Sequence, residues 1–262
     1  MKRIVQLFLI ILIVCMSVFR VSIFAESDQV LNWYCTRNQN HKQPTLGTDL
    51  QIIEKYHGYY VDRNHGDDSN DKVVYLTFDA GYENGNIERI LNTLREEQVT
   101  GAFFILENLI DKNPDLVQRM VQEGHTVCNH TATHRDMTKV DCLEDFCAEL
   151  ESLEEKYKRL TDTEMAKLYR PPEGRFDERS LSFANQLGYS TIFWSFAYAD
   201  WDNNRQPSPE YAKKKIMDNL HNGAVILLHP TSSTNAEILG DVIRQIKSEG
   251  YRFARLEELT KS

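Results

Sequence analysis

The sequence lacks the short motifs that mark several common enzyme classes. It contains no glycine-rich P-loop and no dinucleotide-binding fingerprint, which disfavours phosphate and nucleotide chemistry. It has no Gly-x-Ser-x-Gly elbow, which disfavours an esterase with a serine nucleophile. It also lacks an excess of basic residues: the net charge is −9 and the isoelectric point is about 5.4. Because an acidic protein repels phosphate, we expect no binding to nucleic acid or to an anionic membrane surface.

Cysteine is scarce, and its spacing is unlike that of a metal ribbon or a redox pair. The 262 residues include five cysteines, with no Cys-x-x-Cys pair. Cys15 lies near the N-terminus, whereas Cys142 and Cys147 lie five residues apart on one predicted helix. This spacing favours buried thiols over a bridge, although Cys128 pairing with either thiol stays open. A chain of this length does not need a disulfide to fold.

The N-terminal residues have the pattern of an export signal. Lys2 and Arg3 precede an apolar run from Ile4 to Val18, and Ala25 ends a stretch suited to cleavage. We therefore predict a secretory signal peptide over residues 1–25. An uncleaved membrane anchor is the alternative, and both interpretations place the rest of the chain outside the cytoplasm.

The next segment, residues 26–71, is polar and poorly periodic. Its aromatic residues, which include Trp33, Tyr59 and Tyr60, suggest that it packs onto a folded domain. We predict an N-terminal extension here, followed by the main domain over residues 72–262.

From Lys72 onward, predicted strands and helices alternate, which is typical of βαβ units and a parallel sheet. The predicted strands are Val73–Phe78, Thr100–Leu106, Thr126–Asn129, Lys167–Arg170, Tyr189–Trp194, Ala224–His229 and Phe253–Leu256. The predicted helices are Ile87–Glu97, Pro114–Glu123, Asp141–Leu160, Glu178–Leu187, Pro209–His221 and Ala236–Glu249. We expect an α/β fold, namely a distorted parallel (β/α) barrel of about seven strands.

Polar residues capable of chemistry follow five of these strands. They are Asp79, His130 with His134, Arg170, Asp200 with Trp201, and His229. The carboxyl ends of parallel strands share one face of a barrel, and that face carries the active site. A scatter of structural polar residues would not select the same end of five strands, so we predict one catalytic site there.

These residues also carry a family resemblance. Ordered segments of the chain resemble the five motifs of the polysaccharide deacetylases (carbohydrate esterase family 4, the NodB-homology domain). The segments are Thr77–Gly81, His130–His134, Arg170–Gly174, Asp200-Trp201 and Leu228-His229. The resemblance implies a NodB-like barrel and hydrolysis of an N-acetyl group on a sugar.

Two segments narrow the resemblance to one branch of that family. Thr77–Gly85 and Lys55–Tyr60 resemble the muramic acid de-N-acetylases that prepare muramic δ-lactam in spore cortex peptidoglycan. This implies a monomer that acts on N-acetylmuramic acid in glycan strands, in the cell wall or the forespore intermembrane space. A deacetylase of N-acetylglucosamine in peptidoglycan or chitin-like oligomers is one alternative. A sugar-binding protein without catalysis is another.

The resemblance also implies roles for individual residues. Asp79 would be the general base and Arg170 would keep it ionised, because a neighbouring cation lowers a carboxylate pKa. His229 would be the general acid, since an imidazole titrates near neutrality. His130 and His134 would bind a divalent metal, either Zn²⁺ or Mg²⁺, Mn²⁺ or Co²⁺. We expect substrate contacts from Gly81, Tyr82, Pro171, Trp201 and Leu228.

The sequence departs from the family pattern at two positions. Ala80 stands where the family supplies a third, anionic metal ligand, so we expect weak or conditional metal binding. Ala197 stands where the family has an aspartate that tunes the acid histidine, and Asp200 is the candidate substitute. Glu83 is close to Ala80 in sequence, but no geometric reason assigns it to the metal.

Overall fold

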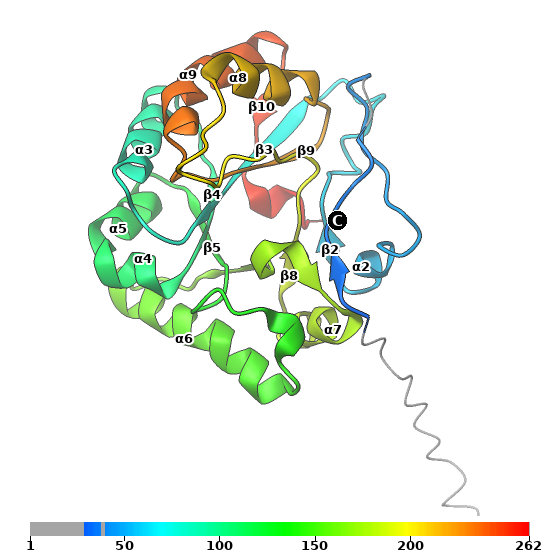
Figure 1. The fold of residues 1–262 in the computed structure, drawn as a ribbon, viewed down its shortest axis with the longest axis vertical. Helices are drawn as coiled ribbons and strands as arrows, with labels where there is room; N and C mark the ends of the chain where they lie inside the picture. The colour runs from blue at the N-terminus through cyan, green and yellow to red at the C-terminus, as the bar shows by residue number, and fades with distance from the viewer. Residues whose placement is uncertain (1–28, 38–39, 262) are drawn as a thin grey trace, which may run out of the picture.

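The computed structural model describes residues 29–37 and 40–261 (Figure 1). The predicted signal peptide, including Cys15, lies outside this part of the chain. Within it, no helix combines the length and the apolar character needed to cross a bilayer.

One parallel sheet organises the fold. Its strands follow the order β10-β3-β4-β5-β6-β8-β2, and β9 pairs with β3. Every pairing in this sheet is parallel. The strands are β2 (Gly58–Tyr59), β3 (Val73–Ala80), β4 (Ala102–Ile105), β5 (Thr126–Asn129), β6 (Ala166–Tyr169), β8 (Ser190–Ile192), β9 (Ala224–Leu228) and β10 (Arg252–Phe253). A short antiparallel pair, β1 (Leu31–Asn32) and β7 (Arg175–Phe176), lies apart from it.

The sheet curves until its two ends meet. Phe196, shortly after β8, forms a parallel bridge to Ile226 of β9, and Val61, shortly after β2, bridges to Ala224. These bridges connect strands at opposite ends of the sheet, so the strands form a distorted barrel with helices outside it. The predicted α/β barrel fold is confirmed.

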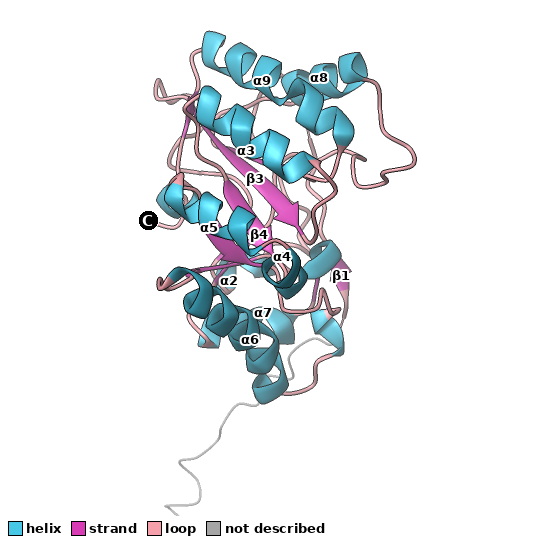
Figure 2. Cartoon of the chain, turned by 90° about the vertical axis from the view of Figure 1, so that its left-hand side faces the viewer, coloured by secondary structure: helices cyan, strands magenta, loops and turns pink. Residues whose placement is uncertain are grey.

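Helices cover the outside of the sheet. Their bounds are α2 (Ile52–Lys55), α3 (Asn86–Glu96), α4 (Glu107–Lys112), α5 (Pro114–Gln122), α6 (Leu143–Thr161), α7 (Glu178–Gln186), α8 (Pro209–Asp218) and α9 (Ser233–Ser248). Figure 2 looks onto the side where α3 and α5 lie in front of β3 and β4. The largest apolar cluster lies between sheet and helices and includes Phe78, Phe103 and Ile243.

Strand alternation divides the residues of β3 between two environments. Phe78 and Ala80 belong to the cluster that faces the helices, whereas Tyr75 belongs to a second cluster, with Phe104 and Val225, inside the barrel. Because side chains alternate along a strand, Asp79 points to the same side as Tyr75. The strand therefore delivers a carboxylate to the barrel interior and an alanine to the outer core.

The structure differs from the predicted elements in a few places. Helix α4 was not predicted, because its six residues are too few to produce a periodic pattern. Strand β8 ends at Ile192 instead of Trp194. The segment before residue 72 supplies β2, which pairs with β8. Two residues give no alternation to detect, so this contribution to the sheet was not visible in the sequence.

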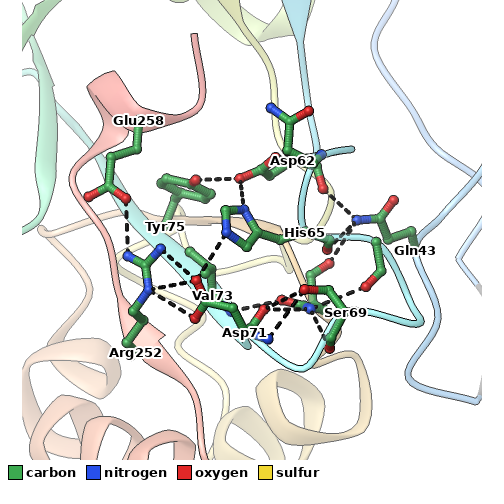
Figure 3. Close-up of polar contacts among 12 residues, drawn as sticks. Gln43, Asp62, His65, Ser69, Asp71, Val73, Tyr75, Arg252 and Glu258 are labelled. Carbon is green, nitrogen blue, oxygen red and sulfur yellow. Dashed lines mark hydrogen bonds and ion pairs between the residues drawn. The ribbon is translucent and has the colours of Figure 1, made fainter. Parts of the chain in front are cut away.

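A polar cluster closes the end of the barrel where the strands begin (Figure 3). Buried Asp62 accepts hydrogen bonds from the Tyr75 hydroxyl (2.5 Å) and lies 2.6 Å from Nδ1 of His65. The other ring nitrogen of His65 lies 3.1 Å from Asp71, which also binds Arg252. We call this the floor cluster; its members are Gln43, Asp62, His65, Asp71, Tyr75, Asn222, Arg252 and Glu258.

The cysteines in the described part of the chain are all free thiols. Cys142 precedes α6 and Cys147 lies within it, and both are only partly buried. Cys128 is fully buried in β5 inside the barrel. The open alternative of a bridge to Cys128 is therefore not realised in the structure.

Candidate active site

A cavity of about 680 Å³ lies at the end of the barrel opposite the floor cluster. Its walls come from the C-terminal ends of the strands and the loops that follow them. The lining residues are Asp79, Gly81, Tyr82, Leu106, His130, His134, Glu173, Gly174, Trp194, Ala197, Tyr198, Trp201, Leu227, His229 and Thr231. Asp79, His130, His134, Trp201 and His229, which are five of the residues predicted to carry chemistry, therefore share one cavity.

Asp79 and His229 are neighbours across two paired strands. The register of β3 and β9 matches Phe78 with Leu228, so Asp79 and His229 occupy the next position on each strand. Neighbouring strands lie about 4.8 Å apart, and residues at matched positions point to the same face. Strand pairing alone thus brings the candidate base and the candidate acid to one wall of the cavity.

Arg170 holds Asp79 from beneath. Its side chain is fully buried, and Nη1 donates to Oδ1 of Asp79 at 2.7 Å. Nη2 donates to the Thr77 hydroxyl at 3.0 Å, and Nε donates to the Ile192 carbonyl at 3.0 Å. The guanidinium also lies over the ring of Phe104, 4.0 Å from its centroid. These contacts fix the position of the guanidinium, so that one of its N–H groups points at the Asp79 carboxylate.

The charge on Asp79 is stabilised in this setting. Burial alone would raise the pKa of the carboxyl group. The charges of Arg170, His130 and His229 outweigh that effect, so the pKa lies below its ordinary value. Asp79 is therefore ionised at neutral pH, with Oδ1 occupied by Arg170 and Oδ2 facing His130 at 3.7 Å.

His130 is a neutral imidazole with one nitrogen available. Burial lowers its pKa to about 4. Its Nδ1 lies 2.8 Å from the carbonyl oxygen of Arg170, which can only accept a hydrogen bond, so Nδ1 carries the proton. Nε2 therefore keeps its lone pair and faces the cavity, as a metal-binding histidine requires.

His134 reaches the same cavity from an unusual backbone conformation. Thr131 and His134 both have positive φ, at 72° and 62°. The Asn129 side chain accepts from the Thr131 amide, and the Thr131 hydroxyl accepts from the His134 amide at 2.9 Å. The rings of His130 and His134 lie 5.0 Å apart, centroid to centroid. These bonds turn the chain so that both histidines face the cavity.

A third strong metal ligand is missing from this arrangement. No three His, Cys, Asp or Glu side chains converge on one point anywhere in the described residues. Ala80 is fully buried in the outer core cluster, and a methyl group offers no lone pair. The donors present therefore fit a cation held by His130 and His134, with its remaining positions filled by water or substrate.

Asp200 contacts His229 directly. Its Oδ1 lies 2.7 Å from Nδ1 of the imidazole, and its Oδ2 accepts from the His229 backbone N–H at 2.8 Å. Burial disfavours the charged imidazole, but the hydrogen bond and charge of Asp200 outweigh burial and raise the pKa of His229 above its ordinary value. With Nδ1 bound to the carboxylate, Nε2 is the atom that can donate a proton into the cavity.

The predicted substrate contacts divide into two groups. Gly81, Tyr82 and Trp201 line the cavity, and among the described residues Trp201 is the most exposed large apolar side chain, at 61%. Leu228 and Pro171 do not line it. Leu228 faces the outer core because it alternates with Leu227 and His229, and of these two leucines it is Leu227 that lines the cavity.

Sequence reasoning missed several residues of the site. Thr77, Glu173, Trp194 and Leu227 contact Arg170 or line the cavity, and none was predicted. Strand alternation from Asp79 and His229 was the signal that identifies Thr77 and Leu227. Glu173 lies in the segment Arg170–Gly174 that carries the resemblance, but no role was assigned to it; it lines the cavity with a positive φ of 58°.

Comparison with known proteins places the chain in a family. A family model described as polysaccharide deacetylase matches residues 66–192. The Bacillus subtilis peptidoglycan-N-acetylmuramic acid deacetylase PdaA is 38% identical over 90% of this chain and 88% of its own length. A Bacillus cereus peptidoglycan-N-acetylglucosamine deacetylase is 28% identical over 74% of this chain and 90% of its own length.

Solved structures agree with this assignment. The structure of PdaA from Bacillus subtilis, described as a family 4 carbohydrate esterase, superimposes with a TM-score of 0.83 and 37% identity, covering 89% of this chain and 97% of that one. A family 4 carbohydrate esterase from Bacillus anthracis gives a TM-score of 0.74 and 34% identity, covering 91% of this chain and 99% of that one. The chain belongs to the polysaccharide deacetylases of carbohydrate esterase family 4, which are hydrolytic enzymes.

Proposed function

We propose that the protein removes the N-acetyl group from N-acetylmuramic acid residues of peptidoglycan. The observation that carries the proposal is the pairing of Asp79 with His229 at one cavity wall, each with its own charged partner. The similarity to a muramic acid deacetylase over nine-tenths of the chain supports this substrate. The free amine and the lactyl carboxyl group would then be the groups that condense, with loss of water, to muramic δ-lactam in the spore cortex.

Asp79 would activate the attacking water. Its Oδ1 is bound to Arg170, so Oδ2 is the oxygen that accepts the proton. Because the pKa of its carboxyl group is lowered, Asp79 is ionised at neutral pH and can accept a proton from water. The same lowered pKa makes it a weaker base. Arg170 orients Asp79 and does not itself contact the reacting atoms.

His229 would protonate the leaving amine. Its raised pKa keeps the imidazolium populated near neutral pH, and Asp200 holds Nδ1 so that Nε2 faces the cavity. Exposed Trp201 lies edge-on to the imidazole, 6.2 Å between ring centroids, and offers an apolar face to a sugar ring.

The polysaccharide deacetylases of family 4 depend on a metal ion. In this chain His130 and His134 would hold it, and the neutral state of His130 leaves Nε2 free for coordination. A divalent cation supplies polarisation of the acetyl carbonyl and of water. Because Ala80 removes the anionic ligand, we propose weak binding of Zn²⁺, Mg²⁺, Mn²⁺ or Co²⁺.

We also propose the setting of this activity. Residues 1–25 would direct export or anchor the chain outside the cytoplasm, in the cell wall or the forespore intermembrane space. Residues 26–71 would form an extension on the catalytic domain of residues 72–262, and the protein would act as a monomer.

The decisive experiment is acetate release from peptide-free muramyl glycan. The protein without residues 1–25 is assayed with EDTA and then with each added cation, beside Asp79→Asn. We expect metal-dependent release that the variant lowers by about 10²–10⁴-fold. No release in any condition would contradict the proposal and favour a sugar-binding protein without catalysis.

The alternative substrate is N-acetylglucosamine, because a relative with that activity covers 74% of the chain. Chitin oligomers and peptide-bearing glycan serve as competing substrates in the same assay. Faster release from either one than from peptide-free muramyl glycan would establish this alternative.

A further inference from the structure

Behind the cavity wall, next to Asp200 and His229, lies a buried amide that no sequence motif indicated. Asn235 lies in the first turn of α9, is 1% exposed, and donates from Nδ2 to Oδ2 of Asp200 at 2.6 Å. The same Nδ2 donates to the backbone carbonyl of His229 at 3.1 Å. The amide therefore contacts both members of the Asp200–His229 pair.

The orientation of this amide follows from its neighbours. A carboxylate and a carbonyl oxygen can only accept hydrogen bonds, so the NH₂ group must face Asp200 and His229. The amide oxygen then faces the other way, where the hydroxyl of Tyr198 donates to it. Tyr198 is buried and lines the cavity, so the chain of donors begins at the cavity wall.

The start of α9 fixes Asn235 in place. The Ser232 side chain caps the helix by accepting from the Asn235 backbone N–H at 3.0 Å. Ser232 also donates to Gln206, whose amide group donates to the Asp200 carbonyl at 2.9 Å. The helix start, the loop before α8 and Asp200 thus form one connected unit.

We infer that Asn235, oriented by Tyr198, is a positioning residue that aligns the Asp200 carboxylate with His229 for proton donation. Asp200 accepts three hydrogen bonds: from His229 Nδ1, from the His229 backbone N–H and from Asn235. The third bond uses a neutral donor, so the carboxylate is held without a cation that would compete for its charge. Asp79, by contrast, is held by a guanidinium.

This role rests on the proposed function of His229 as the general acid. The charged and titratable groups around the imidazole are Asp200 on the loop after β8, Asp79 on β3, Arg170 after β6 and Tyr198 in the cavity wall. Among the described residues, Asp200 alone is in hydrogen-bond contact with the ring. A substitution of Asn235 is therefore expected to alter the titration of the His229 imidazole through its effect on the Asp200 carboxylate.

The test measures the titration of the His229 imidazole by NMR, with the signal assigned from His229→Gln. Asn235→Ala removes one donor from Asp200, leaving more negative charge for the imidazolium, so the titration midpoint rises. Asn235→Asp places a second carboxylate beside Asp200 and raises the titration midpoint of His229 further. Tyr198→Phe removes only the hydroxyl that orients the Asn235 amide, so it changes the midpoint least. Asn219→Ala, which removes an amide bonded to a carbonyl in α8, is the matched control and leaves the midpoint unchanged.

Kinetics provide the second readout. We expect Asn235→Ala to lower kcat about tenfold at neutral pH with little change in KM, and to move the alkaline limb of the rate profile upward with the NMR midpoint. Unchanged midpoints in all three variants would overturn the inference, even if kcat falls. Because the NMR titration needs no substrate, this result is separate from a failure of the proposed function, which would appear as no acetate release by the unaltered protein.

Discussion

At the scale of single residues, two carboxylates of the site have different partners and therefore different tasks. Asp79 is bound by the fully buried guanidinium of Arg170, whereas Asp200 is bound by the imidazole of His229 and an amide. The cation lowers the pKa of Asp79, and Asp200 raises the pKa of His229. Base and acid are thus both in their working forms at the same pH.

The opposite pKa shifts predict a broad pH optimum. Asp79 must be ionised, and because its pKa is lowered, protonation of this carboxylate limits kcat/KM only below the ordinary value of 3.8. His229 must be protonated, and its raised pKa puts the alkaline limb above 6.5, with activity lost as pH rises through it. Asp200→Asn moves the alkaline limb down, because it removes the negative partner of the imidazolium.

The matched control for that profile is Asp202→Asn, an exposed carboxylate two residues away. Its profile should coincide with that of the unaltered protein. An alkaline limb that stays in place in Asp200→Asn would contradict the assignment of His229 as the acid.

Ala80 gives a prediction about metal affinity. Ala80→Asp introduces a carboxylate at a fully buried position, so without metal we expect a loss of several kcal/mol in unfolding free energy. Ala80 packs in the outer core, but its neighbours Asp79 and Gly81 line the cavity, so we expect a carboxylate at position 80 to turn toward His130 and His134. A bound divalent cation would compensate its charge, and added Zn²⁺ would then raise Tm more in the variant than in the unaltered protein. Thermal scans with and without Zn²⁺ measure both effects; equal Zn²⁺-induced shifts would show that position 80 does not reach the metal.

At the scale of elements, the segment before the barrel supports one wall of the cavity. The Trp33 ring stacks on Phe193 with 4.3 Å between centroids, and its indole N–H donates to the Trp194 carbonyl at 2.9 Å. Its backbone N–H donates to Gly174. Trp194 and Gly174 both line the cavity, so this segment shapes the site without entering it.

We therefore predict that Trp33→Ala lowers the unfolding free energy by about 3–5 kcal/mol and also lowers activity in the molecules that remain folded. Urea unfolding and acetate release measure the two effects. The neighbouring Tyr34→Ala is the control, because Tyr34 is 53% exposed and its loss should change neither quantity appreciably. Equal stability of the two variants would contradict this account of the segment.

Long periodic elements were predictable from the sequence, and short ones were not. The apolar spacing of α3 and α5 and the continuous apolar run of β9 located these elements to within a residue or two. Strand β2 was invisible because two residues have no period. Its place in the sheet depends on its pairing with β8, which is a property of the folded chain.

Site residues could be predicted from the sequence where a side chain suited to catalysis or metal binding ends or directly follows a predicted strand, as His130 and His229 do. They could not be predicted where only three-dimensional contact defines the role. Asn235 and Trp194 have no motif, and their tasks come from the carboxylate and the guanidinium that folding brings to them. Leu228 was predicted to contact substrate, but it lies on the outer face of its strand, and the neighbouring Leu227 lies on the face that lines the cavity.

At the scale of the whole molecule, chemistry and anchoring occupy opposite ends of the barrel. The cavity is at the end where strands finish, and the floor cluster is where they begin (Figure 3). In parallel barrels the first end carries function and the second carries stability. Substitutions at the floor should therefore separate the two properties.

Asp62→Ala tests this separation. It removes the acceptor of the buried Tyr75 hydroxyl and one partner of His65, so we expect a loss of about 1–3 kcal/mol in unfolding free energy. Activity per folded molecule should stay unchanged. Asp68→Ala, an exposed carboxylate in the same loop, is the control for stability. A fall in kcat for Asp62→Ala at full folding would contradict the division of the two ends.

The floor cluster also sets the order in which the molecule can be completed. It joins Asp62 and Tyr75, from the first third of the chain, to Arg252 and Glu258, which lie within the final eleven residues. During synthesis, Asp62 and Tyr75 leave the ribosome long before Arg252 and Glu258 have been added to the chain. The floor of the barrel therefore cannot close before the last residues of the chain have been made and have folded onto it.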